Sequence, residues 1–379
     1  MKLKDICEIS AGGTPSRSNK EFWTDGNIPW LKISDLKNKY IDKSEEYITE
    51  TALKNSSAKL FSKGTVLYTI FATIGETGIL NFEATTNQAI AGLKIKDKSL
   101  QSEYLYYYMK SLKEKMLRES RGVAQNNINL SILRELEIKI PNQEDQKHVI
   151  ESLSKLENLI YIKKNEIDKC NSLIKSQFVE MFEKYENYNI MPLSKCTSFI
   201  DYRGHTPKVD EVGSIRMVNA KSVGKGYFKY INEFITEDLY NVWMHRGFAH
   251  PGDILFVTEG HTFGNSCLVP DDLIKFALGQ RVITIQGNEN IINNKYLCSY
   301  MQTKNFYNKI NMYKTGGTAQ GIRSKDLLKI EVPVPPIELQ NKFAMIVEQI
   351  DKQKFVNANL LQLLGKNLKR CYNNIIDFH

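Results

Sequence analysis

The chain contains one sequence pattern twice, and this duplication limits its fold more than any other feature. "GVAQNNINLSILRELEIKIPNQEDQ" begins at Gly122, and "GTAQGIRSKDLLKIEVPVPPIELQ" begins at Gly317. Each copy runs from a Gly-x-Ala-Gln loop through a short apolar segment to a proline and then into a predicted helix. The length of 379 residues is sufficient for two hydrophobic cores. We therefore predict two units of the same architecture.

The repeat continues along the rest of the chain in a single order. The matched pairs are Thr14-Pro15 with Thr206-Pro207, Gly64 with Gly252, Gly75 with Gly264, Gln88 with Gln280, Tyr104-Leu105 with Tyr296-Leu297, and Gln146 with Gln340. A common order of this many pairs is difficult to explain by chance. The duplication therefore includes the domains as well as the hinge that follows each of them.

Each half begins with segments that are rich in β-branched and aromatic residues and are bounded by Gly, Asn or Asp, which predicts strands. These segments are "IPWLKISDL", "TVLYTIFA", "AIAGLKIK" and "LEIKI" in the first half, and "IRMVNAKSV", "DILFVT", "RVITIQ" and "KIEVPV" in the second. One helix is predicted in each half, over residues 102–119 and 293–310. The strands are too irregularly spaced for a βαβ series, so the predicted fold class is α+β.

After each α+β part, a seam of residues recurs at alternating steps of four and three, which is typical of a coiled coil. The first seam is Val149, Leu153, Leu156, Ile160, Lys163, Ile167, Cys170, Ile174, Gln177 and Met181, and the second is Phe343, Val347, Ile350, Lys354, Asn357, Leu361, Leu364, Leu368, Cys371 and Ile375. A single such helix would more often pack on its own domain. Two matched helices are most simply satisfied by packing against each other, and an antiparallel pairing would bring Lys163 and Asn357 together as a polar layer near the midpoint.

These patterns divide the chain into four predicted segments. Two are α+β domains, at residues 1–142 and 187–336. The other two are spacer helices, at residues 143–186 and 337–379. We therefore predict two duplicated domains joined by two long helices that form a coiled coil.

The N-terminal sequence, the cysteines and the net charge indicate a cytoplasmic chain that could bind a polyanion. The N-terminal "MKLKDICEIS" becomes polar too soon for a signal peptide, and no run of eighteen apolar residues occurs, so no membrane association is expected. Six cysteines without a C-x-x-C pair predict reduced thiols. The formal net charge of +8 is compatible with a polyanionic partner.

Motifs of catalysis are missing from the sequence. It contains no G-x-x-x-x-G-K-[ST] phosphate loop, no G-x-S-x-G elbow and no Asn-Pro-Pro-aromatic tetrapeptide of amino-methyltransferases. Asp253 and Glu259 faintly resemble a metal-nuclease pair, but His261 stands where a lysine would be needed. His245, His250 and His261 lack the spacing of a metal site. We therefore assign no catalytic residue and no metal ligand, and we do not expect an enzyme.

Polar and basic loops of the kind that read nucleic acid remain. Arg can bind guanine, Asn and Gln can pair with adenine, and lysines neutralise phosphates. The candidate DNA-binding residues are Thr14, Ser16, Arg17, Lys20, Lys32, Ser34, Thr73, Asn87, Gln88, Arg121, Gln125 and Asn126 in the first half, and Arg203, His205, Thr206, Lys208, Arg216, Asn219, Lys221, His261, Gln280, Arg281, Lys314, Gln320 and Arg323 in the second. Ordinary turns would explain any one of these loops taken alone.

Two α+β domains each followed by a long helix, the "GGTP" and "YRGHTP" loops and the repeated "G-x-A-Q...P...Q" hinge resemble the specificity subunit of a type I restriction-modification system. The resemblance covers the whole chain. It implies that the domains are target-recognition domains and that the helices pair antiparallel. Each domain would then read one half of a split DNA sequence, which would explain why the hinge occurs twice.

The resemblance also implies the partners and cofactors. Double-stranded DNA, two methyltransferase subunits and restriction-translocase subunits would bind the chain. No cofactor is expected in the chain itself, since S-adenosylmethionine, ATP and Mg would belong to the partner subunits.

Two alternatives remain open from the sequence. The chain could serve a single combined methyltransferase-nuclease partner, as in some two-site type II systems, and neighbouring genes would discriminate that case. It could also be an adaptor that binds no DNA and uses its coiled coil to space two protein-binding domains. A steep salt dependence of binding would favour DNA over a protein partner.

Overall fold

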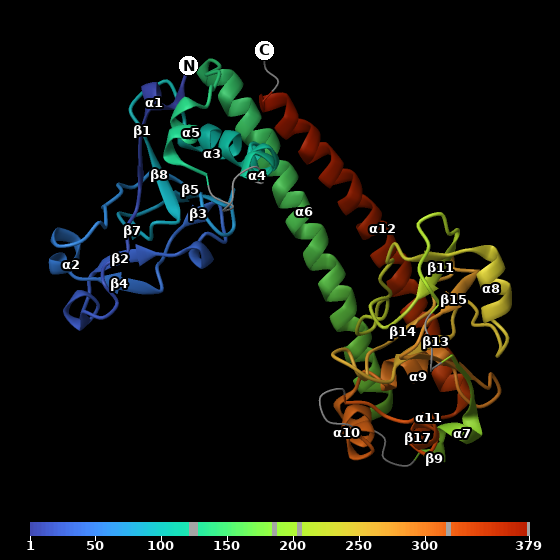
Figure 1. Cartoon of the computed structure of the whole chain (residues 1–379). Coiled ribbons are helices and arrows are strands. Elements are labelled where there is room, and N and C mark those ends of the chain that lie inside the picture. Colours follow the sequence, from blue (N-terminus) through green and yellow to red (C-terminus); the bar gives the residue numbers. More distant parts are fainter. Residues whose placement is uncertain (121–127, 184–187, 203–206, 316–319, 377–379) are drawn as a thin grey trace. The chain divides into compact units, whose positions relative to one another are not determined.

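Figure 1 shows the computed structural model of the chain, which describes residues 1–120, 128–183, 188–202, 207–315 and 320–376. The chain divides into two units. The first consists of Met1–Lys164 with Ala358–His379, and the second of Asn165–Asn357. Each unit therefore contains one α+β domain together with parts of both long helices.

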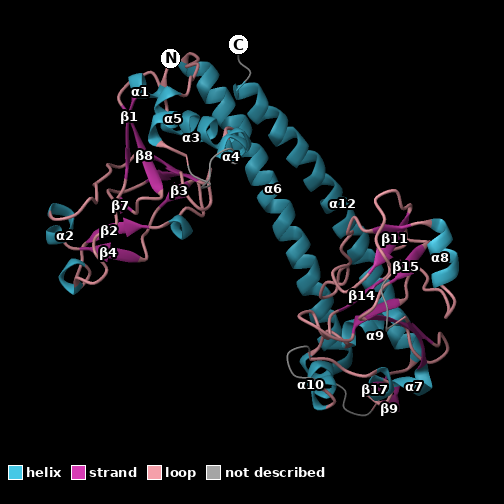
Figure 2. Cartoon of the chain, viewed as in Figure 1, coloured by secondary structure: helices cyan, strands magenta, loops and turns pink. Residues whose placement is uncertain are grey.

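Two sheets form the domain of the first unit (Figure 2). The larger sheet has the order β1 (Cys7–Ala11), β8 (Ile90–Ile95), β5 (Val66–Thr69), β6 (Thr77–Leu80) and β3 (Tyr40–Ile41). Its neighbours are antiparallel except β3 and β6, which are parallel. The smaller sheet has the order β4 (Glu46–Ile48), β2 (Ile28–Leu31) and β7 (Thr85–Thr86). The mainly antiparallel pairing agrees with the predicted α+β class.

Short helices complete this domain. They are α1 (Leu3–Ile6), the 3-10 turns η1 (Lys20–Phe22) and η2 (Ile33–Asp35), α2 (Glu50–Lys54), α3 (Ser102–Ser111), α4 (Lys113–Ser120) and α5 (Leu130–Glu135). Strand β5 is buried at every position because its side chains alternate between two hydrophobic clusters. Val66 and Tyr68 belong to the cluster under α3, whereas Leu67 packs with Leu31 and Leu80.

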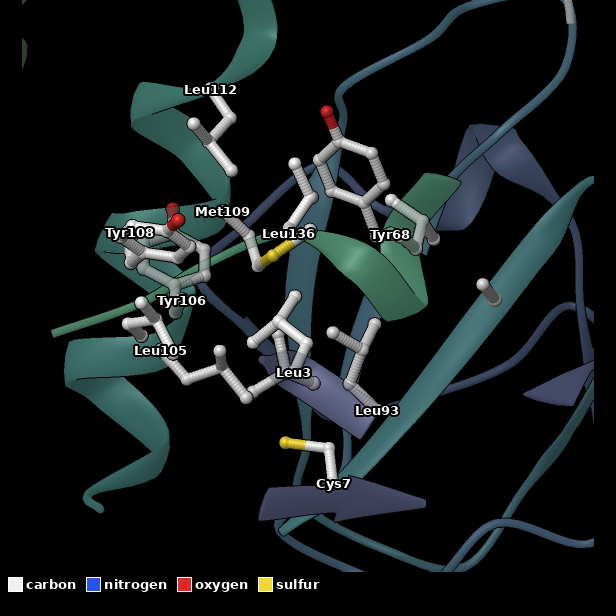
Figure 3. Packing of buried hydrophobic residues seen from close by; sticks show 14 of the residues in the cluster. Leu3, Cys7, Tyr68, Leu93, Leu105, Tyr106, Tyr108, Met109, Leu112 and Leu136 are labelled. Carbon is white, nitrogen blue, oxygen red and sulfur yellow. The ribbon is translucent and has the colours of Figure 1, made fainter. Parts of the chain in front are cut away.

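Helix α3 supplies much of the first core. Figure 3 shows Leu105 and Met109 of this helix gathered with Leu3 of α1 and Leu93 of β8. All four side chains have no exposed surface. Tyr108 is also buried, and its hydroxyl donates a hydrogen bond to the carbonyl oxygen of Glu137. The pair Tyr104-Leu105 of the repeated sequence therefore marks a core helix.

The second unit repeats this architecture. Its sheets have the orders β10 (Thr197–Asp201), β16 (Val282–Gly287), β13 (Ile254–Val257) and β14 (Ser266–Leu268); β12 (Phe234–Ile235), β11 (Ile215–Val218) and β15 (Phe276–Leu278); and β17 (Glu331–Val334) with β9 (Asn189–Pro192). Its helices are α7 (Leu193–Cys196), α8 (Glu237–Trp243), α9 (Asn294–Tyr300), α10 (Lys304–Met312) and α11 (Ser324–Leu327). The order β10-β16-β13-β14 matches β1-β8-β5-β6, and β12-β11-β15 matches β4-β2-β7. The predicted duplicated α+β fold is confirmed.

Two long helices follow the domains. Helix α6 spans Gln143–Phe178 and continues into a π-helical turn at Val179–Glu183, and α12 spans Ile337–Ile376. In the first unit, the beginning of α6 packs with the end of α12, where Leu153 and Ile375 share one cluster. In the second unit, the end of α6 packs with the beginning of α12, where the rings of Phe178 and Phe343 lie 5.6 Å apart. The pairing is therefore antiparallel.

All twenty predicted seam positions are buried or half-buried, whereas Tyr161 and Leu173 beside the seam are exposed. Lys163 and Asn357 fall in different units, so their polar layer stays a prediction. Among the described residues, neither long helix nor any shorter one is apolar enough over a sufficient length to cross a membrane.

Three predicted elements are wrong in detail. The helices predicted over 102–119 and 293–310 are each divided, into α3 and α4 and into α9 and α10. In the second half the break has a clear cause, because the hydroxyl of Thr303 caps α10 by accepting the N–H of Phe306 at 3.2 Å. The segment "LEIKI" forms no strand, only an isolated bridge between Lys2 and Glu137.

Candidate nucleic-acid interface

The Pro and Gln of the repeated hinge form a buried connection between α6 and its domain. Gln146 has no exposed surface. Its side-chain oxygen accepts the backbone N–H of Gln101 at 2.9 Å, and its amide nitrogen donates to the carbonyl oxygens of Ser99 at 2.7 Å and Pro141 at 2.8 Å. One side chain therefore satisfies two backbone groups between strand β8 and helix α3 and one just before α6.

Gln340 makes the same connection in the second unit. It is also fully buried, and its oxygen accepts the N–H of Asn293 at 2.9 Å. Its amide nitrogen donates to the carbonyl oxygens of Ile291 at 3.1 Å and Pro335 at 2.7 Å. Buried backbone groups are costly to leave unpaired, which explains why both copies of the hinge contain this glutamine. We call the two residues with their bonds the glutamine latches.

The loop after β1 lies against the end of β7. The N–H of Gly13 donates to the carbonyl oxygen of Thr86 at 2.9 Å, and a Cβ at Gly12 would overlap both the hydroxyl and the carbonyl oxygen of Thr86. Gly12 is therefore required by this close approach, and Gly13 by its approach to Ser57. As a result, two predicted binding residues meet, because the hydroxyl of Thr14 donates a hydrogen bond to the side-chain oxygen of Gln88.

A cluster of charged and aromatic side chains lies on the smaller sheet of the first unit. The guanidinium of Arg17 lies 3.6 Å from the ring centroid of Trp23 and 4.7 Å from that of Trp30. Glu46 binds Arg17 at 2.6 Å through Oε2 and Lys32 at 2.9 Å through Oε1. Burial alone would raise the pKa of Glu46, but the hydrogen bonds from Lys32 and Arg17 lower it, so this carboxylate is charged at neutral pH.

The other described candidates of the first unit are held less closely. Ser34 and Gln88 are exposed, as are Lys20 in η1 and Thr73 in the loop after β5. The hydroxyl of Ser16 shares a hydrogen bond of 2.8 Å with Ser18. The side-chain oxygen of Asn87 accepts the N–H of Ala89 at 3.1 Å, so Asn87 holds its own turn.

A similar cluster lies on the smaller sheet of the second unit. Glu233 binds Lys221 at 2.5 Å through Oε1 and the amide nitrogen of Asn219 at 2.6 Å through Oε2. The hydrogen bond from Lys221 lowers the pKa of Glu233. Arg216 lies near the rings of Tyr230 and Phe234, with its guanidinium 5.4 and 4.8 Å from their centroids. Two predicted binding residues, Lys221 and Asn219, thus bind the carboxylate of Glu233, and a third, Arg216, lies near the ring of the next residue, Phe234.

A second polar region of this unit joins three loops. The N–H of Gly260 donates to the carbonyl oxygen of Gln320 at 3.0 Å. Glu259 beside it binds Arg281 at 2.9 Å, and Arg281 has a positive φ of 71°. The ammonium of Lys314 lies 5.3 Å from the ring centroid of Phe263. The loops that carry Arg281, Lys314 and Gln320 therefore meet, although they are distant in sequence.

The remaining described candidates of the second unit are Lys208, His261, Gln280 and Arg323. His261 and Lys208 are exposed, and Gln280 is half-buried. Arg323 pairs with Asp326 at 2.6 Å across its own helical turn. Six candidates lie outside the described residues: Arg121, Gln125, Asn126, Arg203, His205 and Thr206.

The sequence interpretation missed both carboxylates that organise the charged clusters. A signal was present, because "EYITE" begins at Glu46 and "EFITE" begins at Glu233. In each copy the threonine caps the following helix, through Thr49 for α2 and Thr236 for α8. This five-residue motif was missed because the two halves were aligned on the glycines, prolines and helix patterns of the repeat.

Among the described residues, no group of three or more His, Cys, Asp or Glu side chains is arranged to hold a metal ion. Asp253 accepts hydrogen bonds from the backbone of His250 at 2.8 Å and from Gln286 at 2.7 Å. Glu259 pairs with Arg281 instead. Asp253 and Glu259 therefore have separate partners.

Comparison with known proteins gives a consistent result. The type I restriction modification DNA specificity domain matches residues 1–172 and 203–364. The MjaIX specificity subunit of the type I restriction enzyme from Methanocaldococcus jannaschii is 28% identical over 394 residues, which cover 96% of this chain and 89% of that protein. The EcoR124I/EcoR124II specificity subunit from Escherichia coli is 30% identical over 163 residues, which cover 41% of this chain and 40% of that protein.

Solved structures share the fold. The S subunit of a type I restriction-modification system from M. genitalium superposes with a TM-score of 0.58 at 17% identity, covering 99% of this chain and 95% of that one. A chain from a structure of type I R-M complex assembly and conformational transition gives a TM-score of 0.60 at 14% identity, covering 99% of this chain and 96% of that one.

The duplicated fold, with a charged cluster on the smaller sheet of each unit, defines a class of protein. In this class one specificity domain occurs twice, and a long helix follows each copy. Within that class the assignment is specific. The chain belongs to the type I restriction-modification DNA specificity family.

Proposed function

We propose that this chain is the DNA-recognition subunit of a type I restriction-modification complex, in which each unit reads one half of a bipartite target. One observation carries the proposal. Both units place basic and polar side chains directly after the central strand of the smaller sheet, at Lys32 after β2 and at Asn219 and Lys221 after β11. Such side chains can bind base edges and neutralise phosphates.

In this proposal residues 1–142 and 187–336 are the target-recognition domains, and residues 143–186 and 337–379 are the spacer helices. The candidate residues in both units contact double-stranded DNA. Two methyltransferase subunits and restriction subunits bind the same chain in the cytoplasm. S-adenosylmethionine, ATP and Mg act in those subunits, so the isolated chain neither methylates nor cleaves.

The test is a domain exchange. The chain is expressed in cells with its methyltransferase subunit, and methylated adenines are mapped across the genome. The intact chain is expected to give a motif with two specified halves. Replacement of residues 1–142 by the matching domain of a relative should change one half and leave the other unchanged.

Three results would contradict the proposal. A change in both halves would show that recognition is not modular. Methylation that does not depend on this chain would favour an adaptor that binds no DNA. Stoichiometric methylation by the purified chain alone would show that the chain is itself an enzyme.

A further inference from the structure

The two carboxylates of the charged clusters occupy one topological position. Glu46 is the first residue of β4 and lies opposite Trp30 of β2. Glu233 directly precedes β12, and its carbonyl oxygen accepts the N–H of Met217 in β11. Since β4 and β12 are equivalent strands, the repeated "E-[YF]-I-T-E" motif places the same side chain on the same sheet edge in both units.

Each carboxylate uses both of its oxygens for polar candidates. Glu46 binds Arg17 and Lys32, and Glu233 binds Lys221 and Asn219. One partner in each unit is the first residue after the central strand, which is Lys32 after β2 and Asn219 after β11. The arrangement is therefore repeated in its geometry, although the partner residues differ in type.

Each carboxylate is less exposed than the basic side chains that it binds. The side chain of Glu46 is 27% exposed, against 52% for Arg17 and 34% for Lys32. The side chain of Glu233 is 21% exposed, against 69% for Lys221. Arg17 and Lys221 are therefore more accessible to a DNA duplex than the carboxylates that hold them, while Lys32 also pairs at 3.3 Å with Glu45, whose side chain is 55% exposed.

We propose that Glu46 and Glu233 are positioning residues for sequence discrimination, each of which fixes two donors of its unit in a geometry that reads base edges. This inference rests on the proposed function. Partly exposed ion pairs add little to the stability of the fold, so stability alone gives a poor reason for both copies. Long side chains such as Lys and Arg have many rotamers, and a fixed acceptor reduces the ordering that base recognition requires.

The experiment compares Glu46→Gln and Glu233→Gln in the full chain, expressed with its methyltransferase subunit, by genome-wide mapping of methylated adenines. Glutamine keeps the shape but removes the charge that binds the two donors. The ratio of methylation at singly altered sites to methylation at intact sites should rise on the order of tenfold or more, since one well-made base contact has about this effect. Glu46→Gln should relax only one half of the motif and Glu233→Gln only the other.

The controls separate this role from simpler ones. Glu151→Gln makes the same change of charge at an exposed position of α6 and should leave the motif unchanged. If the carboxylates only reduce the positive charge, both variants will bind all duplexes more tightly, with a steeper salt dependence and unchanged discrimination. That result would overturn the inference, as would relaxation of both halves by either variant.

Loss of all methylation is resolved with the purified complex and synthetic duplexes. Equal affinity for intact and singly altered duplexes would support positioning. A variant chain that has lost its circular dichroism spectrum and binds no duplex would show that the carboxylate is structural, which also overturns the inference. If the unaltered chain gives no motif with two halves, the proposed function itself fails, whatever the variants do.

Discussion

The glutamine latch of the second unit gives a quantitative prediction. In Gln340→Leu the shape is roughly kept, but three hydrogen bonds are lost. The N–H of Asn293 and the carbonyl oxygens of Ile291 and Pro335 would then be left without this partner. An unpaired buried group costs about 1–3 kcal/mol. Burial of leucine in place of glutamine offsets about 1 kcal/mol. The expected loss in the free energy of unfolding of the second unit is therefore roughly 2–8 kcal/mol.

The assay is hydrogen exchange of backbone amides, because a chain with two units does not unfold in one step. Amides of β13 and β16 should exchange faster in Gln340→Leu, whereas amides of β5 and β8 in the first unit should not change. Gln146→Leu should give the reverse pattern. Gln349→Leu makes the same substitution at an exposed position of α12 and should change stability by no more than about 0.5 kcal/mol. If Gln340→Leu behaves like this control, the argument for the latch is wrong.

Three further predictions concern the first unit. Gly12→Ala should lower the stability of this unit by roughly 1–3 kcal/mol because the new Cβ overlaps Thr86. Gly365→Ala should raise stability by up to about 1 kcal/mol, because this glycine lies inside α12 with nothing within 4 Å of the new Cβ. Thermal unfolding measures both changes. Arg17→Lys keeps the charge but loses the planar fork over the indole rings, so one half-site should relax by about 1–3 kcal/mol in a methylation map, and an unchanged motif would exclude base reading by this residue. Hydrogen bonds from Lys2 and Lys4 lower the pKa of Glu135 from 4.5 to about 2. The contribution of Glu135 to stability is therefore present above pH 4.5 and is lost as the pH falls toward 2. Acid unfolding should show this loss in the native chain and not in Glu135→Gln.

The duplication and the long helices could be predicted from the sequence because both depend on local periodicity. A heptad seam is visible without knowledge of the rest of the fold, and Leu153 and Phe343 lie where the spacing places them. Strands β1 and β10 were missed because they are short: "CEISA" alternates apolar and polar residues, but over only five positions. The breaks between α3 and α4 and between α9 and α10 were missed for a different reason, since caps such as Thr303 are weak signals inside an apolar pattern.

The candidate site was predictable as a set of loops but not as a set of contacts. The residue types in the loops indicated Arg17 and Lys32 as candidates for DNA binding. Nothing in the sequence next to either residue shows that Glu46 binds both. That information is tertiary, because β2 and β4 must pair before the three side chains meet. Glu233 shows that a short internal repeat can replace part of the missing information when a chain contains two copies of one fold.

The latch and the charged cluster of the first unit belong to one continuous path. Gln146 binds Ser99 and Gln101, which lie in the segment between β8 and α3. The carbonyl oxygen of Ile90, the first residue of β8, accepts the N–H of Gly12 at 3.0 Å in the loop that leads to Arg17. A single strand therefore connects the long helix to the polar loop. The two kinds of substitution should consequently differ in effect. Gln146→Leu should lower methylation at every site without altering the motif, because it loosens the attachment of the helix but leaves the donors in place. Arg17→Lys should alter the motif while the helix stays attached. A latch variant that changes base preference would show that the position of the helix, and not only the local cluster, determines which bases are read.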